Sequence, residues 1–454
     1  MGRTNGRRHW RAAASLLLAA GIVGGPVAAP AFAGDSIRED QWHLDAMHAP
    51  EMWQVSKGAG IVVAVIDGGF KLDHPDLVGQ FLPGKDFSGS SGGVGSYVKG
   101  HATQMAGLIA GTGKANGGKG AYGLAPGAKI LPLKIANGDE GSVLESEFMD
   151  QIGQAVTYAV GQGAKVINVS QGTNAALVNR EDVEKLNKIL AWARAKGSLV
   201  FASVGNEAQS GNPVEYPGAL PNVVGVGAVD RNGTVTAESE HGPQVTLVAP
   251  GMDMIAACTE STGYCKGHGT SDATAVASAS AALVWSVHPD WAANQILRVL
   301  INTASKPKDG SNRTEDGGYG AVRPRIALTD PGDPGPADVS PLPTDAATPS
   351  AAASPSASAS VPVSSAPSPA GAASGAPTAQ PKAEVSSGSG SGLPIVGGVV
   401  AGLLVVVGVV FAALRRRKAA VPPVDPQQQL GAVTLPPPPS HQPAVSPEDN
   451  PYAR

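Results

Sequence analysis

The sequence is poor in cysteine, in net charge and in repetition. Its 454 residues contain only two cysteines, and these lack the CxxC spacing that is typical of metal or redox sites. The formal net charge is −4, so no strongly basic balance points to a nucleic-acid partner. No internal repeat is evident, which argues against a repeat architecture. These absences leave a globular protein with no predicted metal site and no nucleic acid as a partner.

Large apolar residues are scarce in the last third of the chain, apart from one run. Residues 332–392 are rich in proline, alanine, serine and glycine, cannot bury enough surface to fold, and predict a disordered stalk. Residues 393–414 carry no charge, and a helix of this length spans about 33 Å, enough to cross a bilayer. The basic residues 415–418 follow, so the disordered tail at 415–454 is expected in the cytoplasm. A buried core helix is the alternative for 393–414.

The N-terminus is typical of a secretory signal peptide at residues 1–33. Four arginines precede an apolar stretch at 12–25, and Ala31-Phe32-Ala33 provides a small-x-small cleavage site. An uncleaved anchor is the alternative. Together with the C-terminal span, the signal predicts a single-pass protein of the cell membrane. Its ordered domain at 34–331 would lie outside the membrane.

Both cysteines fall in the exported part, where disulfides persist. A bridge between Cys258 and Cys265 would close a short loop and contribute about 2–3 kcal/mol in the chain-entropy model. Free thiols are the alternative. Because the loop ends just before Gly269, a bridge would stiffen the approach to the residues that follow.

Residues 34–331 alternate apolar runs with helix-like stretches, which predicts an α/β fold with a mostly parallel central sheet. Continuous apolar runs suit strands that are buried on both faces. The expected strands are Ile61–Ile66, Lys129–Lys134, Val166–Val169, Leu199–Ser203 and Val223–Val226. The expected helices are Thr103–Ala110, Glu145–Gln162, Asn179–Lys196, Ser271–Val287 and Asp290–Thr303. Ligand chemistry would then gather at the carboxyl ends of the strands.

Three residues that suit nucleophilic catalysis occur in one order along the chain. Asp67 ends an apolar run, His101 opens a helix-like stretch, and Ser271 follows Gly269-Thr270. A serine hydroxyl needs a base, a carboxylate that orients the base, and donors for the oxyanion. Asn206, in a Gly-Asn turn after an apolar run, is a candidate donor. Each residue alone is weak evidence, but the order Asp, His, Ser is that of subtilisin-type proteases.

The flanking segments also resemble the subtilisin-like serine proteases, from about Asp35 to Thr303. The matching blocks are Val63–Gly68 with His74–Leu77, Gly100–Thr103 with Ala106-Gly107, Asn168–Gly172, Gly205–Glu207, Tyr216–Gly218 and Gly269–Ser271. The resemblance implies a three-layer fold, a protein or peptide substrate, and a triad of Asp67, His101 and Ser271. It also implies that Asn206 is the oxyanion donor. The substrate-binding residues that it implies are Ser170, Gln171, Gly172 and Glu215.

The wider architecture resembles the mycosins, which are membrane-anchored proteases of actinobacterial type VII secretion. The shared features are the signal peptide, the segment from Gln41 to Trp53, the stalk, the single span and the basic tail. This resemblance implies a type VII secretion membrane complex as a partner. Only about 33 residues separate Gly34 from Asp67, too few for a large inhibitory pro-domain. The segment from Asp35 to Trp53 is expected to wrap the core instead.

The sequence departs from the family pattern at several positions. Asp272 stands where the family has a large apolar residue, and Ala275 stands where it has proline. We expect Asp272 to face away from the oxyanion. The loop at 114–123 has lysines and no carboxylates, so a calcium site there is not supported and no cofactor is expected. A carboxylate at Glu215, near the base of the specificity pocket, would favour lysine or arginine in the substrate; a surface glutamate is the alternative.

Two other functions are compatible with parts of the sequence. A weakly active or inactive protease domain could serve as a scaffold in a secretion complex, and the altered flank of Ser271 is the support for that reading. A nucleotide-binding α/β domain fits poorly, because Gly58-x-Gly60 precedes its strand rather than following it. The leading hypothesis is a membrane-anchored serine endopeptidase.

Overall fold

A computed structural model describes residues 36–137, 143–307 and 309–342. The predicted signal peptide, the span at 393–414, the tail at 415–454 and most of the stalk lie outside the described residues. Among the helices that the structure describes, none is both long enough and apolar enough to cross a membrane.

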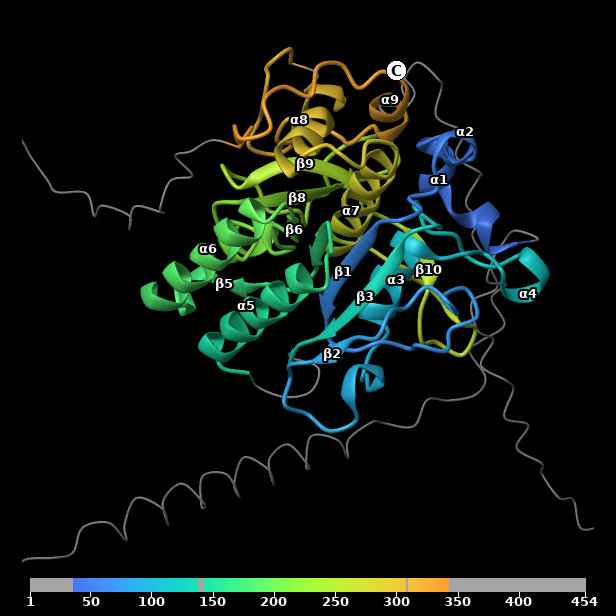
Figure 1. Cartoon of the computed structure of the whole chain (residues 1–454), viewed down its shortest axis with the longest axis horizontal. Helices are drawn as coiled ribbons and strands as arrows, with labels where there is room; N and C mark the ends of the chain where they lie inside the picture. Colours follow the sequence, from blue (N-terminus) through green and yellow to red (C-terminus); the bar gives the residue numbers. More distant parts are fainter. Residues whose placement is uncertain (1–35, 138–142, 308, 343–454) are drawn as a thin grey trace, which may run out of the picture. The chain divides into compact units, whose positions relative to one another are not determined.

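The central element is a seven-stranded sheet in which every neighbouring pair of strands is parallel (Figure 1). In spatial order, its strands are β2 (Lys85–Asp86), β3 (Lys129–Lys134), β1 (Val62–Asp67), β4 (Val166–Val169), β6 (Leu199–Ser203), β8 (Val223–Val229) and β9 (Val245–Pro250). The five strands expected from the sequence are all present. The predicted α/β fold with a mostly parallel sheet is therefore confirmed.

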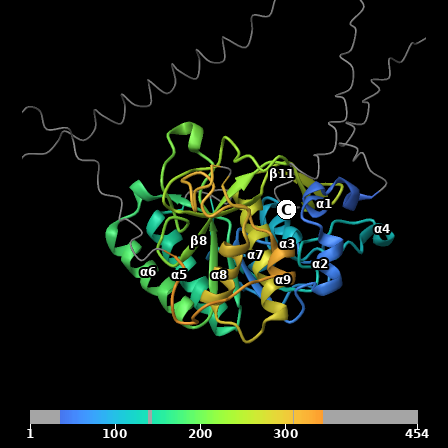
Figure 2. The same cartoon turned by 90° about the horizontal axis from the view of Figure 1, so that it is seen from above.

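Helices cover both faces of the sheet (Figure 2). One layer holds α5 (Glu145–Gly161) and α6 (Arg180–Ala195), and the other holds α3 (His101–Ala110), α7 (Thr270–Val287) and α8 (Ala293–Thr303). Strand β1 separates two apolar cores, because Val63 and Val65 face the α3–α7 layer whereas Ala64 and Ile66 face the α5–α6 layer. Burying one such valine or isoleucine side chain is worth about 1.5–3 kcal/mol.

The order in which successive strands are added to the sheet reverses at β1. The chain runs from β1 through α3 to β3 on one side, and then through α5 to β4 on the other side of β1. Ligands of open α/β sheets bind outside the carboxyl ends of strands at such a reversal. Asp67 is the last residue of β1, and Ser170 follows β4 directly.

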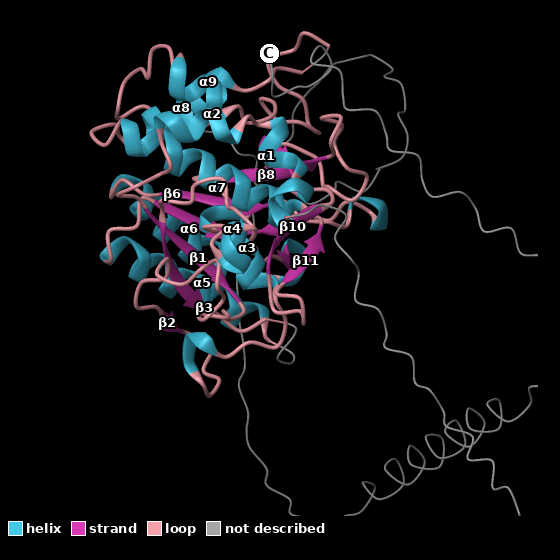
Figure 3. Ribbon diagram, turned by 90° about the vertical axis from the view of Figure 1, so that its right-hand side faces the viewer, coloured by secondary structure: helices cyan, strands magenta, loops and turns pink. Residues whose placement is uncertain are grey.

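Several elements differ from the sequence-based expectation. Strand β9 and the antiparallel hairpin of β10 (Met254–Ala257) and β11 (Tyr264–Gly267) were not expected, and Figure 3 shows this hairpin beside α3. The hairpin strands are only four residues long, and only the first residue of β11 is buried. Helix α8 begins at Ala293 rather than Asp290, because the Gln295 side chain accepts a hydrogen bond from the Ala292 N–H.

Further short elements complete the domain. They are η1 (Ile37–Asp40), α1 (Trp42–Ala46), α2 (Ala49–Val55), η2 (Gly93–Gly95), α4 (Ala115–Gly118), β5 (Thr173–Asn174), η3 (Ala175–Leu177), η4 (Ala208–Ser210), β7 (Glu215–Tyr216) and α9 (Pro324–Thr329). The N-terminal segment packs on the core, as expected. Gln41 donates to the carbonyls of Tyr122 and Ile255, and the Trp42 indole donates to that of Met252.

Candidate active site

Asp67 and His101 form a hydrogen-bonded pair at the carboxyl end of β1. Nδ1 of His101 lies 2.8 Å from Oδ2 and 3.0 Å from Oδ1 of the fully buried Asp67 carboxylate. Oδ1 also accepts the Gly68 N–H at 2.7 Å. The imidazole is fixed by its Nδ1 edge, and 33% of the His101 side chain is exposed. A histidine held in this way keeps the tautomer in which Nε2 is basic.

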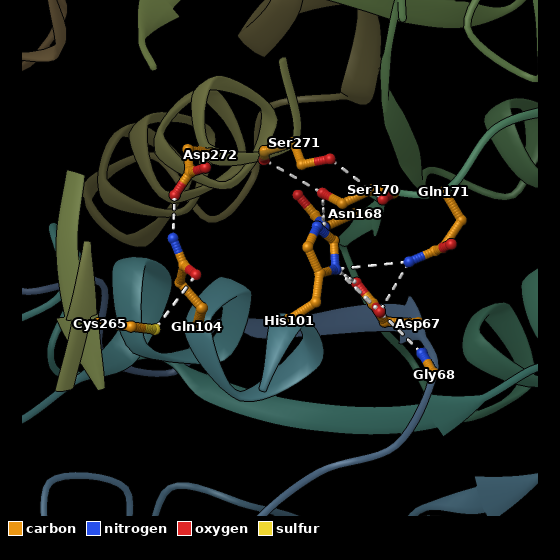
Figure 4. A network of polar contacts seen from close by, with 10 residues as sticks. All are labelled: Asp67, Gly68, His101, Gln104, Asn168, Ser170, Gln171, Cys265, Ser271 and Asp272. Atoms are coloured by element: carbon orange, nitrogen blue, oxygen red, sulfur yellow. Dashed lines mark hydrogen bonds and ion pairs between the residues drawn. The ribbon is translucent and has the colours of Figure 1, made fainter. Parts of the chain in front are cut away.

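The segment after β4 connects this pair to Ser271 (Figure 4). Nε2 of Gln171 donates to Oδ1 of Asp67 at 2.9 Å and lies 3.4 Å from Nδ1 of His101. Its neighbour Ser170 exchanges two hydrogen bonds with Ser271, each 3.2 Å long. In one of them, the Ser271 hydroxyl donates to the Ser170 carbonyl oxygen. Ser170 and Gln171, expected as substrate-binding residues, thus join the two halves of the site.

Ser271 lies in the first turn of α7, directly after a tight approach of the backbone to Asn206. Gly269, the residue before the helix, has φ 121°, and a Cβ atom there would come within 3.0 Å of the side-chain oxygen Oδ1 of Asn206. The positive φ and the close contact both favour glycine at this position, because it has no side chain. Oδ1 of Asn206 accepts the Thr270 N–H at 2.8 Å and the Thr270 hydroxyl at 3.1 Å. These bonds orient the exposed amide, whose nitrogen has no hydrogen-bond partner within the described residues.

Three glutamates gather beside this site. Strand β7 places Glu215 opposite Asn174, and its carboxylate occupies the space that a side chain at Gly172 would need. Burial, and then the charge of Glu207, raises the pKa of Glu215. Burial raises the pKa of Glu240 to about 8, with Glu215 and Glu207 adding to the rise. Oε1 of Glu240 accepts the Glu207 N–H at 3.3 Å, whereas its buried Oε2 has no partner in the described structure.

Asp272 is buried and points away from the Ser271 hydroxyl, toward α3 (Figure 4). Its Oδ1 accepts a hydrogen bond of 2.6 Å from Nε2 of Gln104. Burial raises the pKa of Asp272 to about 7, and the nearby His101 and the Gln104 bond offset part of that rise. The expectation that this carboxyl faces away from the oxyanion agrees with its position.

The loop at 114–123 is organised around the Asp76 carboxylate by hydrogen-bond donors. Both oxygens of the buried carboxylate are engaged by hydrogen-bond donors, with Oδ1 accepting the Ala115 N–H at 2.8 Å. Oδ2 accepts the Ala121 N–H at 2.9 Å and the Tyr264 hydroxyl at 2.8 Å. Burial and the bond to Asp76 raise the pKa of Tyr264, so the phenol keeps its proton. A calcium ion would have to displace these donors, and the loop offers no carboxylate to help.

Cys258 and Cys265 lie at the end of β10 and in β11, at disulfide distance, with Cα atoms 5.8 Å apart. The hairpin thus brings together the two residues for which the sequence predicts a bridge. The Cys265 sulfur is also 3.5 Å from Oε1 of Gln104. The cysteine pair therefore borders the Asp272–Gln104 contact.

Sequence reasoning did not anticipate three side chains of this region. Gln104 and Glu240 were not considered, and Gln171 was expected to contact substrate rather than Asp67. Gln104 and Asp272 are 168 positions apart, and Gln171 and Asp67 are 104 apart. The one available signal was Asp272 itself, since a carboxyl in a small-residue helix requires a buried partner.

Comparison with known proteins agrees with this geometry. The Subtilase family model matches residues 58–322. Thermitase of Thermoactinomyces vulgaris is 31% identical over 267 residues, which cover 59% of this chain and 88% of thermitase. The crystal structure of MycP1 from Mycobacterium smegmatis superposes with a TM-score of 0.57 at 25% identity, covering 66% of this chain and 86% of that one.

A second solved structure, MycP3 protease from the type VII (ESX-3) secretion system, has a TM-score of 0.55 at 29% identity. The match covers 64% of this chain and 88% of MycP3. The family match spans more than half of the chain, and it contains the Asp67–His101 pair and Ser271. The chain therefore belongs to the subtilase family and is a serine endopeptidase.

Proposed function

We propose that the chain is a membrane-anchored, extracytoplasmic endopeptidase that cleaves peptide bonds through an acyl-enzyme on Ser271. The observation that carries this proposal is the pair of contacts, 2.8 and 3.0 Å, from the buried Asp67 carboxylate to Nδ1 of His101. With Nδ1–H held in this way, Nε2 is the basic nitrogen and is available to a nucleophile. The hydrogen bonds from Gln171 to Asp67 and from Ser170 to Ser271 support Ser271 as the nucleophile of the same site.

Each residue has one role in the proposed reaction. The Ser271 hydroxyl turns from the Ser170 carbonyl toward Nε2 of His101, gives up its proton and attacks the substrate carbonyl. Asp67 stabilises the imidazolium that forms. The oxyanion accepts hydrogen bonds from Nδ2 of Asn206 and from the Ser271 N–H, which has no intrahelical acceptor in the first turn of α7. His101 then protonates the leaving amine, and water releases the acyl group by the same route.

A fluorophosphonate probe tests this proposal, because it reacts with a serine only when the serine is activated. The full-length chain in membranes or detergent should be labelled covalently at neutral pH, and heat-unfolded chain should not. A folded wild-type chain that resists the probe would instead support the inactive scaffold. The altered flank is weak support for the scaffold, because Asp272 points toward Gln104 rather than into the site.

Other observations support the proposed membrane placement and the proposed secretion role. The uncharged run at 393–414 and the basic residues after it support a single span with the protease domain outside. The similarity to MycP1 and MycP3, described as proteases of type VII secretion systems, supports a place beside a secretion membrane complex.

We predict that alkaline carbonate, which strips peripheral proteins, leaves the full chain in the membrane pellet. A chain that lacks 393–414 should be released, because no other apolar run of the sequence after the signal peptide is this long. A variant that lacks 343–364 in the stalk is the control and should stay in the pellet. Release of the full chain would contradict the anchor.

We further propose that Glu215 favours lysine or arginine before the cleaved bond. In Glu215→Gln, kcat/KM for basic peptides should fall about tenfold, the equivalent of about 1.4 kcal/mol, while neutral peptides are unaffected. Because the pKa of Glu215 is raised, its side chain ionises to a carboxylate at a higher pH than an ordinary glutamate does. The preference of the wild type for basic residues should therefore weaken on acidification. The measurement is kcat/KM for matched peptide pairs.

Glu184→Gln provides the matched control, since Glu184 is exposed on α6 and forms an ion pair with Arg180 away from the site. That variant should keep the wild-type ratio of basic to neutral peptides. A wild type without basic preference, or an unchanged ratio in Glu215→Gln, would reject the role of Glu215.

A further inference from the structure

A buried polar contact joins the two helices that carry His101 and Ser271. Oδ1 of Asp272 accepts a hydrogen bond from Nε2 of Gln104 at 2.6 Å, and both side chains are more than nine-tenths buried. Asp272 follows Ser271 directly in α7, and Gln104 lies one turn after His101 in α3. The contact therefore connects the segment that carries the nucleophile to the one that carries the base.

Residues of β11 hold the Gln104 amide beside Asp272. A Cβ atom at Gly267 of β11 would come within 1.8 Å of Nε2 of Gln104, so glycine leaves the space that the amide fills. Oε1 of the same amide is 3.5 Å from the Cys265 sulfur. With both ends of the amide in contact, Gln104 has little freedom to move away from Asp272.

The surroundings of Asp272 make this contact costly to lose. The charged or titratable groups that act on Asp272 are His101 of α3 and His268, which precedes α7 and is paired with Glu238. Burial raises the pKa of the carboxyl, and Gln104 provides its hydrogen bond from α3. Without an acceptor at residue 272, the Gln104 amide would lose a buried partner, and the two helices would have to rearrange around it.

We propose that Asp272 and Gln104 form a positioning pair that holds Ser271 at its working distance from His101 during acylation. The pair touches neither substrate nor the reacting atoms and acts through the packing of α3 against α7. The inference rests on the proposed triad. Asp272 departs from the family pattern. On this proposal, Gln104 of α3 is the partner that accompanies the departure.

Misplacement of reacting groups by about 1 Å costs on the order of 100-fold in rate. In Asp272→Leu and in Gln104→Leu, kcat for a peptide amide, whose hydrolysis is limited by acylation, should therefore fall about 10- to 100-fold, with KM within about twofold of wild type. Asp272→Asn keeps an oxygen that can accept from Gln104, so its kcat should stay within about threefold. The double variant should lose little more than either single variant, because both remove one interaction.

Gln80→Leu is the matched control. Gln80 is a buried glutamine whose amide donates to the Ala110 and Pro126 carbonyls, at the opposite end of α3 from His101. It should lower the melting temperature as the test variants do, but leave kcat unchanged at temperatures where the chain is folded. Unchanged kcat in Gln104→Leu, or an equal loss of kcat in Gln80→Leu, would overturn the positioning role.

Two further outcomes separate this proposal from the one that it rests on. If the wild type is not labelled by a fluorophosphonate, the triad fails and the positioning role fails with it. If the wild type is labelled and Asp272→Leu is labelled as fast or faster, the positioning role alone is rejected. Should Asp272→Leu not fold, the labelling rate of Gln104→Leu decides.

Discussion

Replacing Ser271 by alanine should abolish labelling by a fluorophosphonate and lower kcat by about 10⁶, the cost known for subtilisin. Alanine removes the only oxygen that can form the acyl-enzyme. The Ser271 hydroxyl donates to one acceptor, the Ser170 carbonyl, and that carbonyl remains close to the variant side chain. The fold should therefore persist. The measurements are covalent labelling and peptide hydrolysis, together with the melting temperature.

A control for this variant lies in the same helix. Ser280 of α7 is buried and donates to the Val276 carbonyl within the helix, so Ser280→Ala removes a hydroxyl without touching the site. It should be labelled like wild type. Residual turnover of Ser271→Ala within tenfold of wild type would show that another residue is the nucleophile.

In Asp67→Asn, kcat should fall about 10⁴-fold, because the histidine is held in the wrong tautomer. Oδ1 of Asp67 accepts from the Gly68 N–H and from Gln171, so the asparagine oxygen should take this position. The amide nitrogen then replaces Oδ2, which lies 2.8 Å from Nδ1 of His101. Because an amide nitrogen only donates, Nδ1 has to accept, and the ring proton moves to Nε2. The imidazole can no longer act as a base for Ser271.

Asp73→Asn is the appropriate comparison for that loss. Asp73 is an exposed carboxylate that pairs with Lys71 at 3.1 Å, near Asp67 in sequence but outside the site. Its kcat should equal that of wild type. A decrease of less than tenfold in Asp67→Asn, measured with the same peptide, would argue that Asp67 does not orient the base.

The sequence was sufficient to predict five of the seven strands of the sheet and the three residues of the proposed triad, for a physical reason. Strands buried on both faces are continuous apolar runs, and Asp67 stands out at the end of such a run. Short elements without this pattern were missed. Strand β11 has only four residues, of which only the first is buried, and β9 includes Thr246 and ends in a proline.

The side chains that support the site could not be predicted from the sequence, for a different reason. Gln104 and Glu240 belong to residue types that are usually exposed, so their burial depends on partners far away in the chain, and the half-buried Gln171 likewise meets a distant partner. The Gln104–Asp272 contact joins residues 168 positions apart. No local pattern encodes such a pairing, and only the packing of α3 against α7 brings it about.

The contacts of Ser170 and Gln171 also determine when the chain can first cleave a peptide bond. Gln171 meets a partner 104 positions earlier, and Ser170 meets one 101 positions later. Contacts over such separations form late in folding, because the long loops between them must close first. If the chain is exported N-terminus first, as proposed, Asp67 and His101 emerge well before Ser271. In the proposed topology, proteolytic activity would therefore begin only once the whole domain has crossed the membrane and folded.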